Sequence, residues 1–108
     1  MGADRRGEVS LVDLGYAAKT RPALIISVPP LDTERALVSL VPHTTTPRGT
    51  RFEVVSNERF LKPGVFDPQN LVTVPEAKLL RKLGKLQPTI FQGVHVSVCK
   101  WLGVTASS

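Results

Sequence analysis

Residues 21–30, Arg-Pro-Ala-Leu-Ile-Ile-Ser-Val-Pro-Pro, carry the clearest strand signal in the chain. The run over residues 23–28 is rich in aliphatic and β-branched side chains, and its length is typical of a strand. Prolines stand on both sides of it, and a residue without a backbone N–H favours the ends of a strand over its interior. The stretch predicts one short strand and indicates that prolines divide the chain into elements.

Four further runs of the same kind are separated by proline and glycine. They cover residues 8–14, 36–41, 51–55 and 71–74. Short strands that follow one another without intervening helices form antiparallel sheets. The sequence therefore predicts a mainly β fold, an antiparallel barrel of about five strands.

The C-terminal segment fits two periodicities. Three alternating valines, at positions 94, 96 and 98, fit a half-buried strand. Over a wider window the apolar side chains fall on one helical face: Ile90, Phe91, Val94, Val98, Trp101 and Leu102. Pro88 suits the first turn of a helix and Gly103 suits its end, so we predict a C-terminal helix. Residues 76–82 are predicted to form a brief helical connector, because Pro75 and Gly84 confine them.

Length and composition restrict the class of protein. The 108 residues, 42% of them hydrophobic, are enough for one core, so we expect a single domain over residues 1–108 with its core at about 6–103. The lone Cys99 cannot form an internal disulfide. No apolar stretch approaches the roughly 20 residues of a membrane span, and no signal peptide is evident. We therefore expect a cytoplasmic protein that does not contact membranes.

The chain is basic. Fourteen Lys and Arg residues stand against nine Asp and Glu residues, which gives a formal charge of +5. A positive field of this size attracts polyanions, and nucleic acid is the natural partner. The alternative is that the charge serves solubility alone.

The connection between the first two predicted strands carries an aromatic side chain and two cations, Tyr16, Lys19 and Arg21. Because Pro22 disfavours the helical conformation for the residue before it, Arg21 is expected to be extended at the start of a strand. A guanidinium offers a planar fork of donors that matches a phosphate group. The alternative interpretation is a surface ion pair, for example with Asp13.

Residues 42–51, Pro-His-Thr-Thr-Thr-Pro-Arg-Gly-Thr-Arg, form an unusually polar segment after the third predicted strand. Its hydroxyls and amides can donate to phosphate oxygens, while Arg48 and Arg51 can contact flanking phosphates. The alternative is a turn whose hydroxyls bond to their own backbone. His43 is a candidate general base, although a single histidine supplies only half of an acid–base mechanism.

Several enzyme classes lack support in the sequence. There is no phosphate-binding GxxxxGK[ST] loop, no HExxH, no CxxC pair and no GxSxG. The carboxylates are scattered among different segments, which gives no support for a two-metal nuclease. We therefore expect no metal and no cofactor.

Several motifs, in order, resemble those of the MazF/PemK toxins. They are residues 7–9 (GEV), 12–14 (VDL) and 19–27 (KTRPALIIS), then 41–45 (VPHTT), 71–74 (LVTV) and 79–86 (LLRKLGKL). The family usually carries K-x-R-P before an apolar strand, P-L-T-S later, and i-R-T-[IV] before the last helix. The resemblance covers roughly residues 6–103.

The resemblance implies an SH3-like barrel with a C-terminal helix, and a homodimer whose interface groove binds single-stranded RNA. It further implies a metal-independent endoribonuclease that cleaves by 2′-hydroxyl attack, and an antitoxin partner with an acidic disordered tail. By motif, Arg21 and Thr44 occupy the catalytic positions. The residues then expected to contact RNA are Tyr16, Lys19, Thr20, His43, Thr45, Arg48, Arg51 and Asn70.

The chain departs from the family pattern near these positions. The loop before Arg21 is short, His43 replaces the usual leucine, Asn70 stands where many members have glutamine, and Val72 replaces a frequent arginine. The cleavage motif therefore cannot be transferred. A guanidinium with a pKa above about 12 is a poor base, so Arg21 is expected to stabilise charge on the phosphorus centre and Thr44 to donate a hydrogen bond. The alternative function is a non-catalytic SH3-like module that binds nucleic acid or a peptide.

Overall fold

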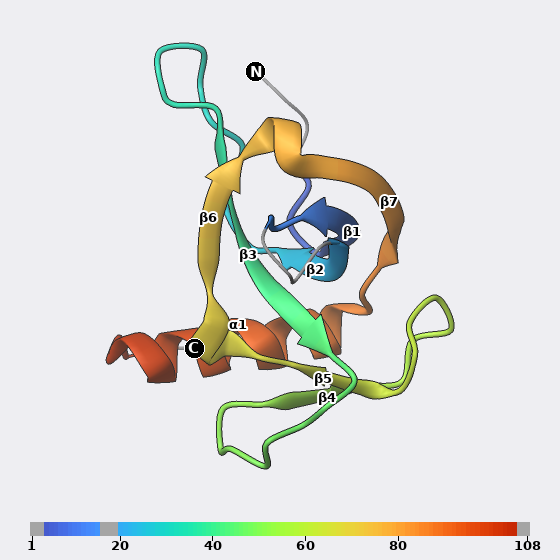
Figure 1. Ribbon diagram of the computed structural model, residues 1–108. Coiled ribbons are helices and arrows are strands. Elements are labelled where there is room, and N and C mark those ends of the chain that lie inside the picture. The colour runs from blue at the N-terminus through green and yellow to red at the C-terminus, as the bar shows by residue number, and fades with distance from the viewer. Residues whose placement is uncertain (1–3, 16–19, 106–108) are drawn as a thin grey trace.

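The computed structural model describes residues 4–15 and 20–105, which form an antiparallel sheet with one α-helix packed against it (Figure 1). The strands are β1 (Glu8–Asp13), β2 (Thr20–Ile25), β3 (Leu37–Thr44), β4 (Val54–Ser56), β5 (Gly64–Phe66), β6 (Val72–Pro75) and β7 (Leu79–Lys85). Two short 3₁₀ turns, η2 (Pro68–Asn70) and η3 (Glu76–Lys78), precede β6 and β7, and the helix is α1 (Pro88–Leu102).

The strands pair in the order β4-β5-β3-β2-β1-β7, and β6 also pairs with β3. All of these pairings are antiparallel. The prediction of a mainly β antiparallel fold with a C-terminal helix is confirmed. The prediction of a barrel of about five strands is wrong in two respects, because the described residues contain seven strands and the sheet does not close into a barrel.

Two strands escaped prediction. Residues 64–66 form β5, a three-residue strand too short to give a periodic signal. Residues 79–85 form β7, although the sequence favoured a helical connector over residues 76–82. There the helical turn is limited to η3, and the following residues pair with β1 from Glu8↔Lys85 to Val12↔Leu79. Pairing with a free strand edge decides the outcome over local helix propensity.

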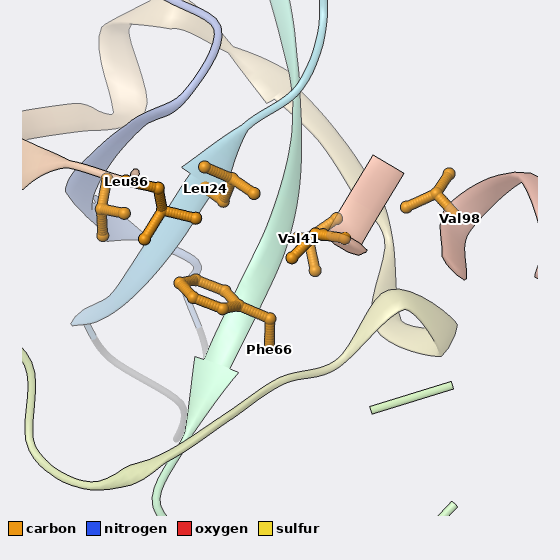
Figure 2. Close-up of a cluster of buried hydrophobic side chains, with 7 residues drawn as sticks. Leu24, Val41, Phe66, Leu86 and Val98 are labelled. Carbon is orange, nitrogen blue, oxygen red and sulfur yellow. The ribbon is translucent and has the colours of Figure 1, made fainter. Parts of the chain in front are cut away.

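The larger core cluster lies between the sheet and α1 (Figure 2). Its fully buried members include Leu24 of β2, Val41 of β3 and Phe66 of β5, which pack against Val94 and Val98 of the helix. Burying side chains of this size contributes roughly 1.5–3 kcal/mol each. Packing of its apolar face therefore stabilises α1, because the β-branched residues of the helix give it little stability of its own.

The helix begins and ends where the sequence predicts. Pro88 stands in the first turn, and Gly103 takes a left-handed conformation with φ 74°, so that its N–H reaches the carbonyl oxygens of Cys99 and Lys100. Within the described residues, no helix is long and apolar enough to cross a membrane.

A second cluster packs on the opposite face of β1, β2 and β3. Its buried members are Val12, Ala23, Ile25, Val38 and Leu40. Side chains alternate along a strand, so neighbours such as Ala23 and Leu24 belong to different clusters. Both faces of the central strands are consequently buried, and this explains why their sequences are almost continuously apolar.

Substitution of Gly64 tests how closely β5 packs against the end of β3. A Cβ at this position would overlap the carbonyl oxygen of Thr44 and the His43 ring. We predict that Gly64→Ala lowers the free energy of unfolding in urea by about 1–3 kcal/mol, because backbone must shift to admit it. Gly93→Ala is the matched control. The nearest atom there, on Val54, is 3.8 Å away, so alanine should stabilise α1 by about 0.5–1 kcal/mol. Equal effects of both substitutions would contradict the close approach of β5.

Candidate functional site

The candidate site lies where the pairing of β3 changes from β6 to β5. The first half of β3 pairs with β6 as far as Leu40↔Val72, and its last residues pair with β5 from His43↔Phe66. Between these pairs, residues 41–42 face the five residues 67–71. Pro42 has no N–H to offer a partner strand, and its carbonyl oxygen accepts from the N–H of Asp67 at 2.9 Å. The excess residues form η2 and leave a hollow beside the end of β3.

Arg21 and Thr44 occupy equivalent places at the ends of neighbouring strands. The β2–β3 ladder is recorded as far as Ala23↔Pro42, and the same register continued by two residues places Arg21 opposite Thr44. Residues opposite one another in an antiparallel pair project to the same face. This is the face of Ala23 and the second core cluster.

Both side chains line one pocket of about 600 Å³, called here the first pocket. Its apolar walls are Leu14, Val72 and Val74, which pack against the second core cluster. Its remaining lining residues are Arg21, Pro42, Thr44, Thr45, Thr46, Arg48, Glu53, Asp67 and Asn70. The structure therefore brings together residues from β2, from the segment after β3 and from η2.

The Thr44 hydroxyl is already oriented by its own chain. Its Oγ1 accepts a hydrogen bond from the N–H of Thr46 at 3.1 Å. This is the local turn that the alternative interpretation of the threonine segment anticipates. Because the oxygen is engaged as an acceptor, its O–H proton points elsewhere and can be donated to another group.

A carboxylate holds the polar segment that follows Thr44. The Glu53 side chain accepts from the backbone N–H groups of Arg48 and Gly49, each at 2.9 Å. The bond from Arg48 and those from Gly49 and Thr50 lower the pKa of Glu53, so it stays ionised at neutral pH. At the end of the segment, the Ser97 hydroxyl of α1 donates to the carbonyl oxygen of Phe52 at 2.5 Å. The segment is thus anchored at both ends.

A second carboxylate orients Asn70. Asp67 is 8% exposed and its Oδ2 accepts from Nδ2 of Asn70 at 2.9 Å. An ionised carboxylate can only accept, so the amide must turn its NH₂ group toward Asp67. The amide oxygen of Asn70 and its second N–H remain available to a ligand.

His43 lies on the other face of β3 from Thr44. It is 3% exposed, its ring meets Phe66 edge-on at 5.2 Å between centroids, and its Nε2 has no hydrogen-bond partner among the described residues. Burial lowers the pKa of His43 below its ordinary value of 6.5. The ring is therefore neutral at pH 7 and packs as a core side chain.

The other predicted contact residues are distributed around the site. Arg48, Thr45 and Asn70 line the first pocket. Thr20, which precedes Arg21 in β2, is exposed and does not line this pocket; it lies beside Arg21 on the other face of the strand end. The Arg51 guanidinium lies 4.5 Å from the centre of the Phe52 ring and outside the lining of the first pocket. Tyr16 and Lys19 lie outside the described residues.

Sequence reasoning missed the structural role of Glu53 and Asp67. It treated them as scattered acids, and their neighbours in the chain carry no motif that predicts the backbone bonds. The one available signal was Asp67-Pro68, a dipeptide that favours a turn. Among the described residues, no cluster of three or more His, Cys, Asp and Glu side chains could hold a metal ion.

Fold and site together define a small, mainly β protein with a polar pocket at the ends of two central strands, in which Arg21 lies beside the Thr44 hydroxyl. Residues 5–102 match the family model of PemK-like, MazF-like toxins of type II toxin-antitoxin systems. The chain belongs to this family.

Solved structures agree with this assignment. An endoribonuclease in complex with its cognate antitoxin, from a mycobacterial species, is 28% identical with a TM-score of 0.81, covering 97% of this chain and 100% of that chain. A mycobacterial endoribonuclease is 26% identical with a TM-score of 0.79, covering 99% and 98%. The MazE-MazF structure from Deinococcus radiodurans is 18% identical with a TM-score of 0.79 over 97% of this chain and 100% of that one, and supports the fold alone.

The buried, neutral His43 predicts a pH-dependent stability. Because its pKa is lowered in the folded state, the unfolded state binds more protons below about pH 6.5. Stability is therefore complete above that pH and declines as the pH falls below it. We predict that His43→Leu removes this part of the decline in urea denaturation measured from pH 5 to 7.5. His95→Gln, at an exposed position of α1, should retain it. An unchanged decline in His43→Leu would contradict the burial of a neutral ring.

Proposed function

We propose that this chain is the endoribonuclease toxin of a type II toxin–antitoxin pair and that it cleaves single-stranded RNA. The observation that carries the proposal is the position of Arg21 and Thr44, on one face at neighbouring strand ends and in one pocket. Membership of the toxin family supports it, as does the likeness to a mycobacterial endoribonuclease.

The proposed reaction is attack of a ribose 2′-oxygen on the adjacent phosphorus. The 2′-oxygen loses its proton and bonds to phosphorus, the bond from phosphorus to the 5′-oxygen breaks, and that oxygen gains a proton. The products are a 2′,3′-cyclic phosphate and a 5′-hydroxyl end. The Arg21 guanidinium stabilises the negative charge on the phosphoryl oxygens, and the Thr44 hydroxyl donates to one of them.

The surrounding residues then bind the rest of the strand. Arg48 contacts a neighbouring phosphate and Asn70 reads a base edge through its free amide groups. Thr20 and Thr45 contact the backbone on either side of Arg21. Contacts from Tyr16, Lys19, His43 and Arg51 stay predictions, and for His43 its burial leaves packing as the simpler role.

The partners follow from the same family membership. We propose that the toxin domain extends over residues 1–108, forms a homodimer in the cytoplasm, and is neutralised by a cognate antitoxin. An acidic, disordered antitoxin tail would compete with RNA for the cations of the first pocket.

Arg21→Ala is predicted to abolish cleavage without unfolding the protein, since the side chain is exposed. Arg21→Lys should restore little, because an ammonium group keeps the charge but loses the bidentate fork. The assay is the mapping of 5′ ends after incubation of a mixed-sequence RNA with the pure protein in excess EDTA. Rates for Arg21→Lys within a few-fold of wild type would argue against stabilisation by the guanidinium. RNA binding without any cleavage by the wild type would favour the alternative, a non-catalytic binding module.

Thr44→Val is predicted to slow cleavage by roughly ten- to a thousandfold, the range for loss of one transition-state donor. Valine also removes the acceptor for the Thr46 N–H, so Thr44→Ser is needed, and it should retain most of the activity. Thr46→Val preserves that backbone bond and is the matched control. A larger loss in Thr46→Val than in Thr44→Val would show that the wrong threonine has been assigned.

A further inference from the structure

A second pocket of about 510 Å³ lies on the other face of the same strand ends. Arg21 and Thr45 line both pockets, so the two hollows meet at these side chains. The other residues that line the second pocket are Leu11, Thr20, Pro22, His43, Phe60, Leu61, Lys62, Arg81 and Leu83. No acidic residue is among them.

Strand register explains how the second pocket is built. Leu11 of β1 stands opposite Arg81 of β7 on one side and opposite Pro22 of β2 on the other. These three side chains therefore project to one face of the sheet, which is the face covered farther along by α1. A backbone bond fixes Arg81, whose carbonyl oxygen accepts from the Ser10 hydroxyl at 2.8 Å.

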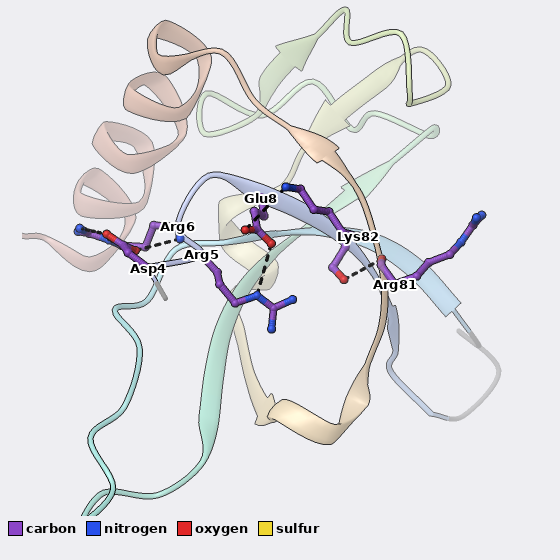
Figure 3. A network of polar contacts seen from close by, with 7 residues as sticks. Asp4, Arg5, Arg6, Glu8, Arg81 and Lys82 are labelled. Carbon is purple, nitrogen blue, oxygen red and sulfur yellow. Dashed lines mark hydrogen bonds and ion pairs between the residues drawn. The ribbon is translucent and has the colours of Figure 1, made fainter. Parts of the chain in front are cut away.

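Besides Arg21, the cations Lys62 and Arg81 line the second pocket. Within residues 4–15 and 20–105, neither Lys62 nor Arg81 has a carboxylate within 4.0 Å. Figure 3 shows the Arg81 side chain directed away from the carboxylates of Asp4 and Glu8. The adjacent Lys82 is different, because its Nζ lies 4.0 Å from Oε2 of Glu8. Because Lys62 and Arg81 have no carboxylate partner among the described residues, and because no acidic side chain lines the pocket, the pocket favours the binding of a polyanion.

The second pocket also has an apolar wall, which includes Phe60 and Leu61. The Phe60 ring lies on Gly84, where a Cβ would come within 2.5 Å of its carbons, so this contact requires glycine. Phe60 and Leu61 also pack against the core cluster beneath α1. A flat aromatic and aliphatic wall beside cations fits a nucleotide, since a base can stack on the wall while its phosphate meets the cations.

We propose that the second pocket is a nucleotide subsite, which binds the RNA strand after it passes Arg21 from the first pocket. The inference rests on the proposed function, and it adds Lys62 and Arg81 as phosphate contacts and Phe60 as a stacking surface. The volume of the second pocket falls within the range of about 300–1,000 Å³ that ligand pockets span. The strand thus bends around the ends of β2 and β3, with the scissile phosphate held at the bend by Arg21.

The test compares Lys62→Ala and Arg81→Ala with Lys82→Ala, which removes one charge from the neighbouring position. The probe is a mixed-sequence oligonucleotide of 2′-O-methyl RNA, which lacks the attacking hydroxyl and is bound without being cleaved. Binding is measured across a range of salt concentrations, and thermal unfolding confirms that each variant is folded. Each loss of a phosphate contact should weaken binding and reduce the slope of log K against log salt by about 0.7. Lys82→Ala should leave the slope unchanged.

The outcomes separate this inference from the proposed function. Unchanged slopes in Lys62→Ala and Arg81→Ala would overturn the subsite, even if the wild type cleaves RNA. Equal reductions in all three variants would also overturn it, because they would reflect net charge alone. Weaker binding of the cognate antitoxin without weaker oligonucleotide binding would assign the second pocket to a protein partner instead. Reduced slopes in the two variants would support the subsite even if no RNA were cleaved.

Discussion

The alternation of side chains along β2 and β3 is the constraint on which both the core and the candidate site depend. Leu24 and Val41 project toward α1, whereas Ala23 and Leu40 project to the opposite face. Both rows continue to the strand ends, where apolar side chains give way to polar ones. The row of Ala23 therefore ends in Arg21, and its face opens into the first pocket. A shift of one residue in this register would place Arg21 and Thr44 on opposite faces of the sheet, so the packing of the core fixes the site.

Two arginines and two carboxylates line the first pocket, and the carboxylates hold its shape. Glu53 binds the backbone of the segment after β3, and Asp67 binds Asn70 while its own N–H is joined to Pro42. Each carboxylate accepts hydrogen bonds from amide N–H groups. Neither forms an ion pair with Arg21 among the described residues. Arg21 thus remains available to a polyanion, whereas the charge of Arg48 also interacts with Glu53.

Much of the fold could be predicted because strong local signals decide it. The aliphatic run over residues 23–28 indicates β2, although the strand spans Thr20–Ile25 and includes Pro22. Pro88 with Gly103 marks the limits of α1. β7 could not be predicted, because its sequence has helical propensity and only the free edge of β1 makes it a strand. The break opposite Pro42 was equally hidden, since it depends on a pairing between segments distant in sequence. Motif resemblance made Arg21 and Thr44 candidates, and their catalytic role stays a prediction, while the second pocket required knowledge of three strands and their register.

The chemistry proposed for Arg21 follows from the lack of a nearby side chain that is free to act as a general base. His43 is neutral and packed against Phe66 on the far face, so it does not meet a phosphate held between Arg21 and Thr44. Asp67 has one oxygen engaged with Asn70. Rate enhancement in the first pocket would therefore come mainly from holding the phosphate beside fixed donors, as expected where charge develops next to a preorganised guanidinium. A strand bent between two pockets would add to this, because bending at the scissile phosphate can align the 2′-oxygen with the departing 5′-oxygen, and in-line attack requires that alignment.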